Sequence, residues 1–153
     1  MQQATLCFLL KGNEVLLGMK KRGFGIGKWN GFGGKVHEGE SIENCVIRET
    51  REESGVHLVE FEKVGEIEFF FPAKREWEMA VQVFRSRTWN GEERETEEMM
   101  PMWFDKACLP FEQMWADDRE WLPRVLNGER IVAKFVFEAD NETIKEFEIK
   151  QES

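Results

Sequence analysis

The segment from Ser41 to Gly55 limits the possible fold more than any other part of the sequence. Ser41 is a candidate helix N-cap, and Gly55 stands where a helix that ends in a left-handed residue favours glycine. At 100° per residue, one arc about 120° wide collects six side chains: Ile42, Cys45, Val46, Glu49, Glu52 and Glu53. We therefore predict a helix over 41–54 whose first two turns are buried and whose last two turns present carboxylates.

These three carboxylates require positive charge nearby. Glu49 and Glu53 are one helical turn apart and repel each other by roughly 0.2–0.5 kcal/mol when exposed, and by more where the face is covered. Hard divalent cations bind oxygen ligands, and Mg²⁺ favours a few carboxylates together with water and substrate phosphates. The alternative is a solvated acidic face that Arg48 and Arg51 balance, which is the commoner origin of an isolated charge run.

The residues around this helix predict strands. Lys11-Gly12-Asn13-Glu14 and Pro72-Ala73-Lys74-Arg75 are turn sequences, and each is flanked by apolar runs. The two predicted hairpins use the strands Thr5–Leu10, Val15–Met19, Val64–Phe71 and Glu78–Phe84. Six glycines between positions 23 and 34 predict a loop or tightly bent backbone.

The C-terminal part predicts a second helix and further strands. Residues 92–98 are acid-rich and expected to be exposed, 102–104 resemble a short strand, and 109–115 an irregular stretch. A helix is predicted over 117–126, with Pro123 bending it. Ile131–Phe137 and Thr143–Ile149 alternate apolar with polar residues and predict a closing strand pair. Together these elements predict an α/β fold with a mixed sheet.

Length and charge limit the partners. A chain of 153 residues predicts one domain over 1–153 with one active site. The formal net charge of −9 disfavours nucleic acid and anionic membranes, whereas a small polyphosphate is compatible if divalent cations shield it. Cys7, Cys45 and Cys108 are odd in number and widely spaced, which indicates a reducing compartment. We expect a cytoplasmic monomer.

A family resemblance bears on the two interpretations of the acidic helix face. Gly34, Glu40 and the run Arg48-Glu49-Thr50-Arg51-Glu52-Glu53-Ser54-Gly55-Val56 resemble the Nudix box, G-x5-E-x7-R-E-U-x-E-E-x-G-U. Every Gly, Glu and Arg of that pattern is present, and the single departure is Thr50, where the family usually has a bulky aliphatic residue. A motif that specifies this many positions is far more specific than a short glycine motif.

The resemblance implies a Nudix α/β/α sandwich with a mixed central sheet and a loop-helix-loop catalytic motif. It also implies that Glu49, Glu52 and Glu53 are metal ligands and that the Gly34 carbonyl adds another. Arg48 lies at i,i+4 to Glu52 and either holds that carboxylate for the metal or forms an ordinary helix salt bridge.

Segments outside the box resemble the oxidised purine nucleoside triphosphatases, or 8-oxo-dGTP diphosphatases, over residues 16–25, 29–36, 110–111 and 114–118. The positions that match this subfamily imply a base pocket: Asn30, Asp117 and Asp118 read the purine edge, Phe24, Phe69, Met79 and Trp115 enclose its faces, and Thr5 is a further pocket residue. Glu98 matches a position near the metals. Lys20 is a candidate phosphate contact or a solvated lysine at a strand end.

The adjacent acids Asp117 and Asp118 have two interpretations. In a dry pocket both cannot easily stay ionised, so one would be protonated and able to donate to a base. Alternatively, they cap the following helix. Trp115 and Phe69, without the resemblance, would be ordinary core residues.

The resemblance implies an enzyme that uses Mg²⁺, with Mn²⁺ as a substitute. It would hydrolyse 8-oxo-dGTP, and also 2-hydroxy-dATP, to the monophosphate and pyrophosphate and so sanitise the nucleotide pool. Glu53, Glu52 or Glu98 would be the general base. Two alternatives are a Nudix hydrolase of another nucleoside diphosphate derivative and a non-catalytic nucleotide-binding module.

Overall fold

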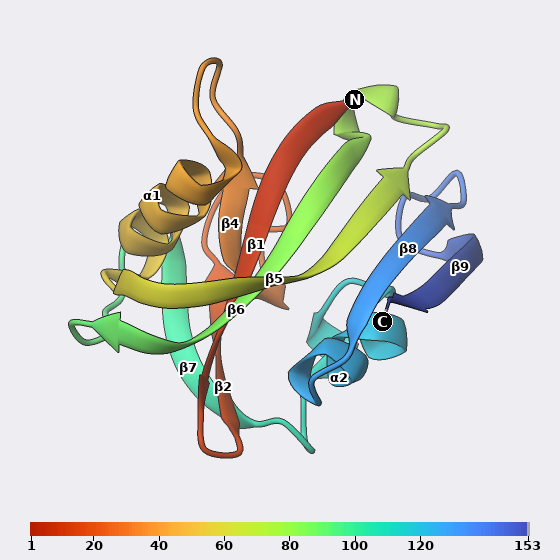
Figure 1. Cartoon of the computed structure of the whole chain (residues 1–153). Coiled ribbons are helices and arrows are strands. Elements are labelled where there is room, and N and C mark those ends of the chain that lie inside the picture. The colour runs from red at the N-terminus through yellow and green to blue at the C-terminus, as the bar shows by residue number, and fades with distance from the viewer. Residues whose placement is uncertain (153) are drawn as a thin grey trace.

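A computed structural model describes residues 1–152 and is built around one mixed sheet (Figure 1). The strand order is β3-β2-β1-β6-β5-β8-β9, while β4 pairs with β1 and β7 with β2. The strands are β1 (Gln2–Lys11), β2 (Glu14–Lys20), β3 (Trp29–Asn30), β4 (Phe32–Lys35), β5 (His57–Phe70), β6 (Met79–Asn90), β7 (Met99–Asp105), β8 (Arg130–Phe137) and β9 (Ile144–Glu152). The helices are α1 (Ile42–Ser54) and α2 (Asp118–Leu126), with short 3₁₀ turns η1 (Arg75–Trp77) and η2 (Phe111–Gln113).

The sheet is mixed because strands from distant parts of the chain pair in both directions. β1 runs parallel to β6, and β5 runs parallel to β8, whereas the hairpin neighbours are antiparallel. On one side, β1 pairs with β2 near its C-terminal end and with β4 near its N-terminal end, where Thr5 is the register partner of Gly34. The expected α/β class with a mixed sheet is confirmed.

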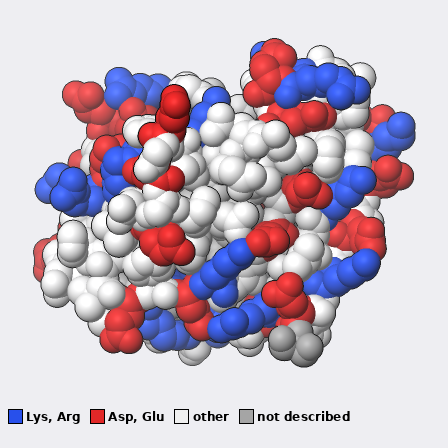
Figure 2. All heavy atoms as spheres, turned by 45° about the horizontal axis from the view of Figure 1, so that its top comes forward, with Lys and Arg blue, Asp and Glu red and all other residues white. Residues whose placement is uncertain are grey.

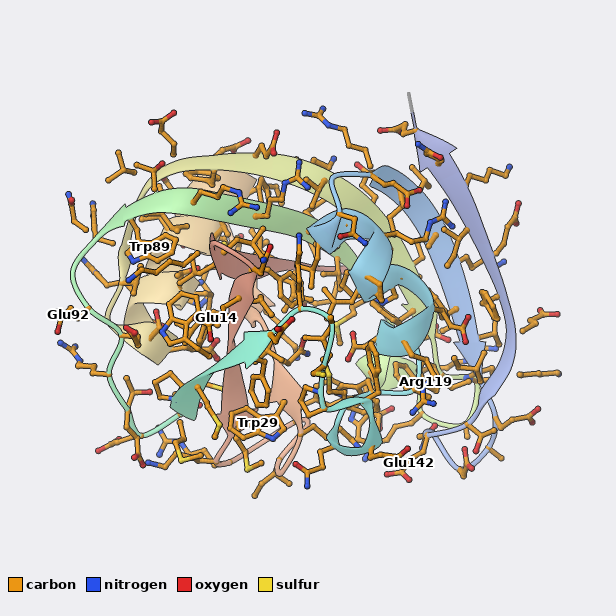
Figure 3. The ribbon with its side chains drawn as sticks, turned by 90° about the horizontal axis from the view of Figure 1, so that it is seen from below. Glu14, Trp29, Trp89, Glu92, Arg119 and Glu142 are labelled. Atoms are coloured by element: carbon orange, nitrogen blue, oxygen red, sulfur yellow. The ribbon has the colours of Figure 1, made fainter. Side chains whose placement is uncertain are left out.

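Each face of the sheet has its own core. Phe8 and Leu10 of β1 pack in the cluster that contains Trp121 of α2, while Cys7 and Leu9 pack in the cluster that contains Val46 of α1. This division follows from the period of two in a strand, which points successive side chains to opposite faces. Seen from below, α1 and α2 lie on opposite sides of the molecule, with Trp29 of β3 between them (Figure 3).

The structure extends and corrects several expected elements. Both predicted hairpins form, but β5 and β6 are longer than expected. Part of the glycine-rich segment is extended: residues 29–35 form β3 and β4 instead of a loop. The reason is close packing, since a Cβ on Gly33 would lie 1.8 Å from the Thr5 carbonyl oxygen. Neither helix in residues 1–152 has the length and apolar character needed to cross a membrane.

Candidate active site

The ends of α1 are set by the caps that the sequence indicates. The Ser41 hydroxyl accepts a hydrogen bond from the Asn44 N–H at 3.1 Å. Gly55 is left-handed at φ 81° and donates its N–H to the Arg51 carbonyl at 2.8 Å. Because these caps set where the helix begins and ends, its last turn presents the glutamates toward β4, which packs against α1.

Glu53 is the buried carboxylate of this last turn. Its side chain lies under β4, where Oε1 accepts the Gly33 N–H at 2.9 Å and Oε2 lies 3.4 Å from the Lys20 ammonium. Burial raises the pKa of Glu53 to about 7, although the Gly33 N–H and Lys20 both favour the charged form. A cation bound to the Glu53 carboxylate would therefore be needed to keep this group fully ionised near neutral pH.

Arg48 organises the neighbouring carboxylates. Its guanidinium donates two hydrogen bonds to Glu40, at 2.7 and 2.9 Å, and one to Glu49 at 2.7 Å, while the contact with Glu52 is longer at 3.2 Å. These bonds lower the pKa of Glu40 to about 2, with Arg48 the main cause. The expected contact from Arg48 to Glu52 is present, but Arg48 bonds Glu40 and Glu49 more closely. The carboxyl carbon of Glu49 lies 2.6 Å from the place that a Cβ on Gly34 would occupy.

Lys20 connects Glu53 to Glu98. Its ammonium lies 3.4 Å from a carboxylate oxygen of each residue, so one cation serves two acids. Arg22 holds Glu98 more closely, at 2.6 and 2.9 Å, and these hydrogen bonds lower the pKa of that carboxyl. Glu98 is thereby brought from the acid-rich segment 92–98 to the end of α1.

A cavity of about 320 Å³ opens beside these carboxylates. All of the residues that the resemblance assigns to the base pocket line it, together with Lys20, Gly34 and Glu53: Thr5, Phe24, Asn30, Phe69, Met79, Trp115, Asp117 and Asp118. Its volume lies within the range of about 300–1,000 Å³ that is typical of small-molecule sites. Because Thr5 and Gly34 are register partners, the cavity and the acidic end of α1 share a wall.

Asp117 and Asp118 lie at the end of this cavity, and only 3% and 2% of their surfaces are exposed. Asp117 accepts a hydrogen bond from the Trp121 indole N–H at 2.7 Å, whereas Oδ2 of Asp118 has no partner within residues 1–152. Burial raises the pKa of both carboxyls, and the charge of Asp117 raises that of Asp118 further. Asp117 occupies the N-cap position but makes no side-chain capping bond, so the capping interpretation is wrong for this residue.

Aromatic rings form the walls. Phe24 stacks on Trp115 with centroids 5.1 Å apart and an interplanar angle of 24°. Phe69 stacks on Phe135 at 5.9 Å behind the cavity. The combination of flat apolar walls with buried hydrogen-bonding groups is suited to a planar heterocycle with polar edges.

The sequence matches the family model described as the NUDIX domain over residues 1–125. The chain belongs to the Nudix family. It is also similar to two proteins named oxidized purine nucleoside triphosphate hydrolase: one from Danio rerio, 49% identical over 134 residues (88% of this chain and 85% of that protein), and one from Mus musculus, 44% identical over 147 residues (96% and 93%). A crystal structure of a MutT protein from Bacillus halodurans has a TM-score of 0.82 and 27% identity, and the match covers 98% of each chain.

Nudix hydrolases generally need a divalent metal ion, and the donor set here fits one in chemistry. Glu49 and Glu53 supply carboxylate oxygens beside the Gly34 backbone, which is the all-oxygen set that hard cations prefer. In the described conformation, no three His, Cys, Asp or Glu side chains of residues 1–152 form a group that could hold a metal ion. Lys20 and Arg48 bind the same oxygens instead, so a metal ion would compete with both.

Several residues of this Nudix cavity were not predicted. Phe71, Trp77, Phe137 and Trp121 line it as well. Trp121 could have been found, since it follows Asp117 by four residues on a predicted helix and such residues share a face. No local pattern distinguishes the other three aromatic residues from ordinary core residues.

Proposed function

We propose that this protein is an Mg²⁺-dependent hydrolase of oxidised purine nucleoside triphosphates, with Mn²⁺ as a substitute ion, that releases the monophosphate and pyrophosphate. The observation that carries the proposal is one cavity with two chemically distinct ends. One end has aromatic walls and two buried aspartates, and the other contains Glu53 and Gly34 of the Nudix motif. The names of the similar proteins from Danio rerio and Mus musculus support the same activity.

At the base end, the proposed readers are Asn30, Asp117 and Asp118. The amide of Asn30 offers both a donor and an acceptor. Asp118 lines the same cavity, and its Oδ2 is buried with no partner among residues 1–152, so it is suited to a hydrogen bond with the base edge. If one of Asp117 and Asp118 is neutral and the other ionised, the pair offers a donor and an acceptor together. Moving the proton from one to the other would exchange these roles and match the hydrogen-bonding pattern of a second oxidised base.

At the phosphate end, Glu49, Glu53 and the Gly34 carbonyl are the proposed metal ligands, with Glu52 and Glu98 completing the set. Bound Mg²⁺ would neutralise the developing charge on the triphosphate and orient the attacking water. Arg48 keeps Glu49 in place through its bond at 2.7 Å. Glu53 is our first choice for the principal ligand, and Lys20 is placed to turn from Glu53 and Glu98 to the phosphates.

Pyrophosphate release tests this function. The panel is 8-oxo-dGTP, 2-hydroxy-dATP, dGTP and ADP-ribose, each with Mg²⁺ and with a chelator. We expect the oxidised triphosphates to be preferred and activity to require the metal. Preference for ADP-ribose would indicate a hydrolase of diphosphate derivatives, and binding without turnover a nucleotide-binding module; either result would reject the proposal.

We also propose a single domain over 1–153, of which Ser153 lies outside the described residues, and a monomeric state. The face in Figure 2 intersperses both charge signs around an uncharged central area, which supports a small-molecule partner over nucleic acid or membrane. Cys7, Cys45 and Cys108 are free thiols, which supports a reducing compartment such as the cytoplasm.

A further inference from the structure

Trp77 lines the cavity and comes from a turn in which no sequence pattern indicates a functional residue. It is the last residue of η1, between β5 and β6. Its indole meets the Phe24 ring edge to face, with centroids 4.9 Å apart and an interplanar angle of 77°. It meets Phe71 in the same manner at 5.6 Å.

Phe24 lies in a glycine-rich loop between β2 and β3, which backbone hydrogen bonds such as Gly27 N–H to the Lys20 carbonyl close. It lies between Gly23 and Gly25, which are both left-handed at φ 80° and 82°. Glycine loses more conformational freedom on folding than any other residue, so ordering this loop costs more entropy and depends more on its tertiary contacts. Phe24 is 43% exposed, and its ring stacks on Trp115 and also contacts Trp77 edge to face.

Trp77, in contrast, is held by its own turn. The backbone N–H of Trp77 donates to the Lys74 carbonyl at 3.0 Å, and the Lys74 ammonium lies 4.4 Å from the centre of the Trp77 ring. The start of the turn is fixed because the Phe71 N–H donates to the Glu78 carboxylate at 3.1 Å. The indole is therefore a fixed surface against which the ring of Phe24 packs.

We propose that Trp77 is a positioning residue for the substrate base: it holds Phe24 on Trp115 and thereby keeps this aromatic wall of the cavity formed before the substrate arrives. The inference rests on the proposed function and adds to it a residue outside the motif and outside the predicted pocket. A wall that is already ordered reduces the entropy lost on binding. Since the ring of Trp77 contacts the wall residues Phe24 and Phe71, its contribution falls on KM and leaves kcat in place.

Steady-state kinetics with 8-oxo-dGTP tests the proposal. We expect Trp77→Ala to raise KM by about 2- to 12-fold, the equivalent of one aromatic pair, with kcat within about twofold of wild type. Trp77→Phe should restore most of the affinity because it keeps an aromatic edge. The matched control is Trp89→Ala, which removes a half-buried tryptophan that stacks on Trp103 and does not line the cavity, and it should leave KM unchanged.

A double-mutant cycle with Phe24→Ala shows whether Trp77 acts through Phe24. If it does, Trp77→Ala raises KM in the wild-type background and has no further effect in the Phe24→Ala background. Hydrogen exchange of residues 23–28 without substrate should become faster in Trp77→Ala and stay unchanged in Trp89→Ala. Equal effects in both backgrounds, or unchanged exchange in a folded Trp77→Ala protein, would overturn the inference. If wild type hydrolyses no oxidised purine nucleotide, the proposed function fails, and the exchange experiment still decides the role of Trp77.

Discussion

Replacing Asp117 by Asn should stabilise the protein, and the gain should grow with pH. Asp117 is buried beside a second acid, and burial raises its pKa from the ordinary 3.8 to about 6. The folded chain therefore binds this proton more tightly than the unfolded chain does. As a result, the free energy of unfolding of wild type falls as pH rises from about 3.8 to about 6. Asn carries no charge, so the variant avoids this loss.

The size of the effect follows from the same interval. A difference between 3.8 and about 6 corresponds to about 3 kcal/mol, since each pH unit is worth about 1.36 kcal/mol. The bond of 2.7 Å from the Trp121 indole N–H survives, because the Asn side-chain oxygen can accept it. The variant should thus match wild type at about pH 4 and exceed it by about 3 kcal/mol near pH 7.

Urea unfolding of both proteins at several pH values measures this difference. Asp140→Asn is a control of opposite sign: Asp140 accepts hydrogen bonds from Thr143, which lower its pKa. Its charged form therefore stabilises the protein above the ordinary pKa, so Asp140→Asn should lose stability relative to wild type as pH rises. A stability difference for Asp117→Asn that stays constant with pH would refute the reasoning, because it would mean that the buried acid is not neutralised in this range.

Three further substitutions test the phosphate end and the helix beneath it. Gly34→Ala should weaken Mn²⁺ binding, measured by calorimetry, because its Cβ would lie 2.6 Å from the Glu49 carboxyl carbon. Glu53→Gln should lower kcat by orders of magnitude while circular dichroism shows an intact fold; near-normal turnover would contradict its proposed role. Thr50→Val should raise the free energy of unfolding by about 1 kcal/mol, because the buried Thr50 hydroxyl has no hydrogen-bond partner in the described chain other than its contact with the Cys7 thiol. A lower urea midpoint for this variant would argue against the prediction.

Much of the candidate site could be predicted because its signals are local. The caps Ser41 and Gly55 and the spacing of Glu49 and Glu53 depend on residues within four positions of one another. The pocket residues came from matching scattered segments to a known subfamily. Their assembly around one cavity agrees with that expectation, while their roles remain proposals.

Other features could not be predicted because they depend on contacts between distant residues. Lys20 and Glu98 are 78 positions apart, and their contact requires the pairing of β2 with β7. The extended conformation of residues 29–35 depends on β1, which provides the partner backbone for β4. No local pattern separates Trp77 from a core tryptophan. Its proposed role follows from its contact with the ring of Phe24, which only the tertiary structure shows.

By itself, the sequence determined that a capped helix carries glutamates on the face of its last turns, that the chain alternates between strand and helix patterns, and that it carries a Nudix motif. Periodicity and capping are properties of neighbouring residues, so no fold is needed to recognise them. The tertiary structure decided which acids are buried and which cations they contact. Glu53 shares Lys20 with Glu98, and one oxygen of Asp118 has no partner within residues 1–152, because burial and pairing arise only when strands from both halves of the chain meet in one sheet.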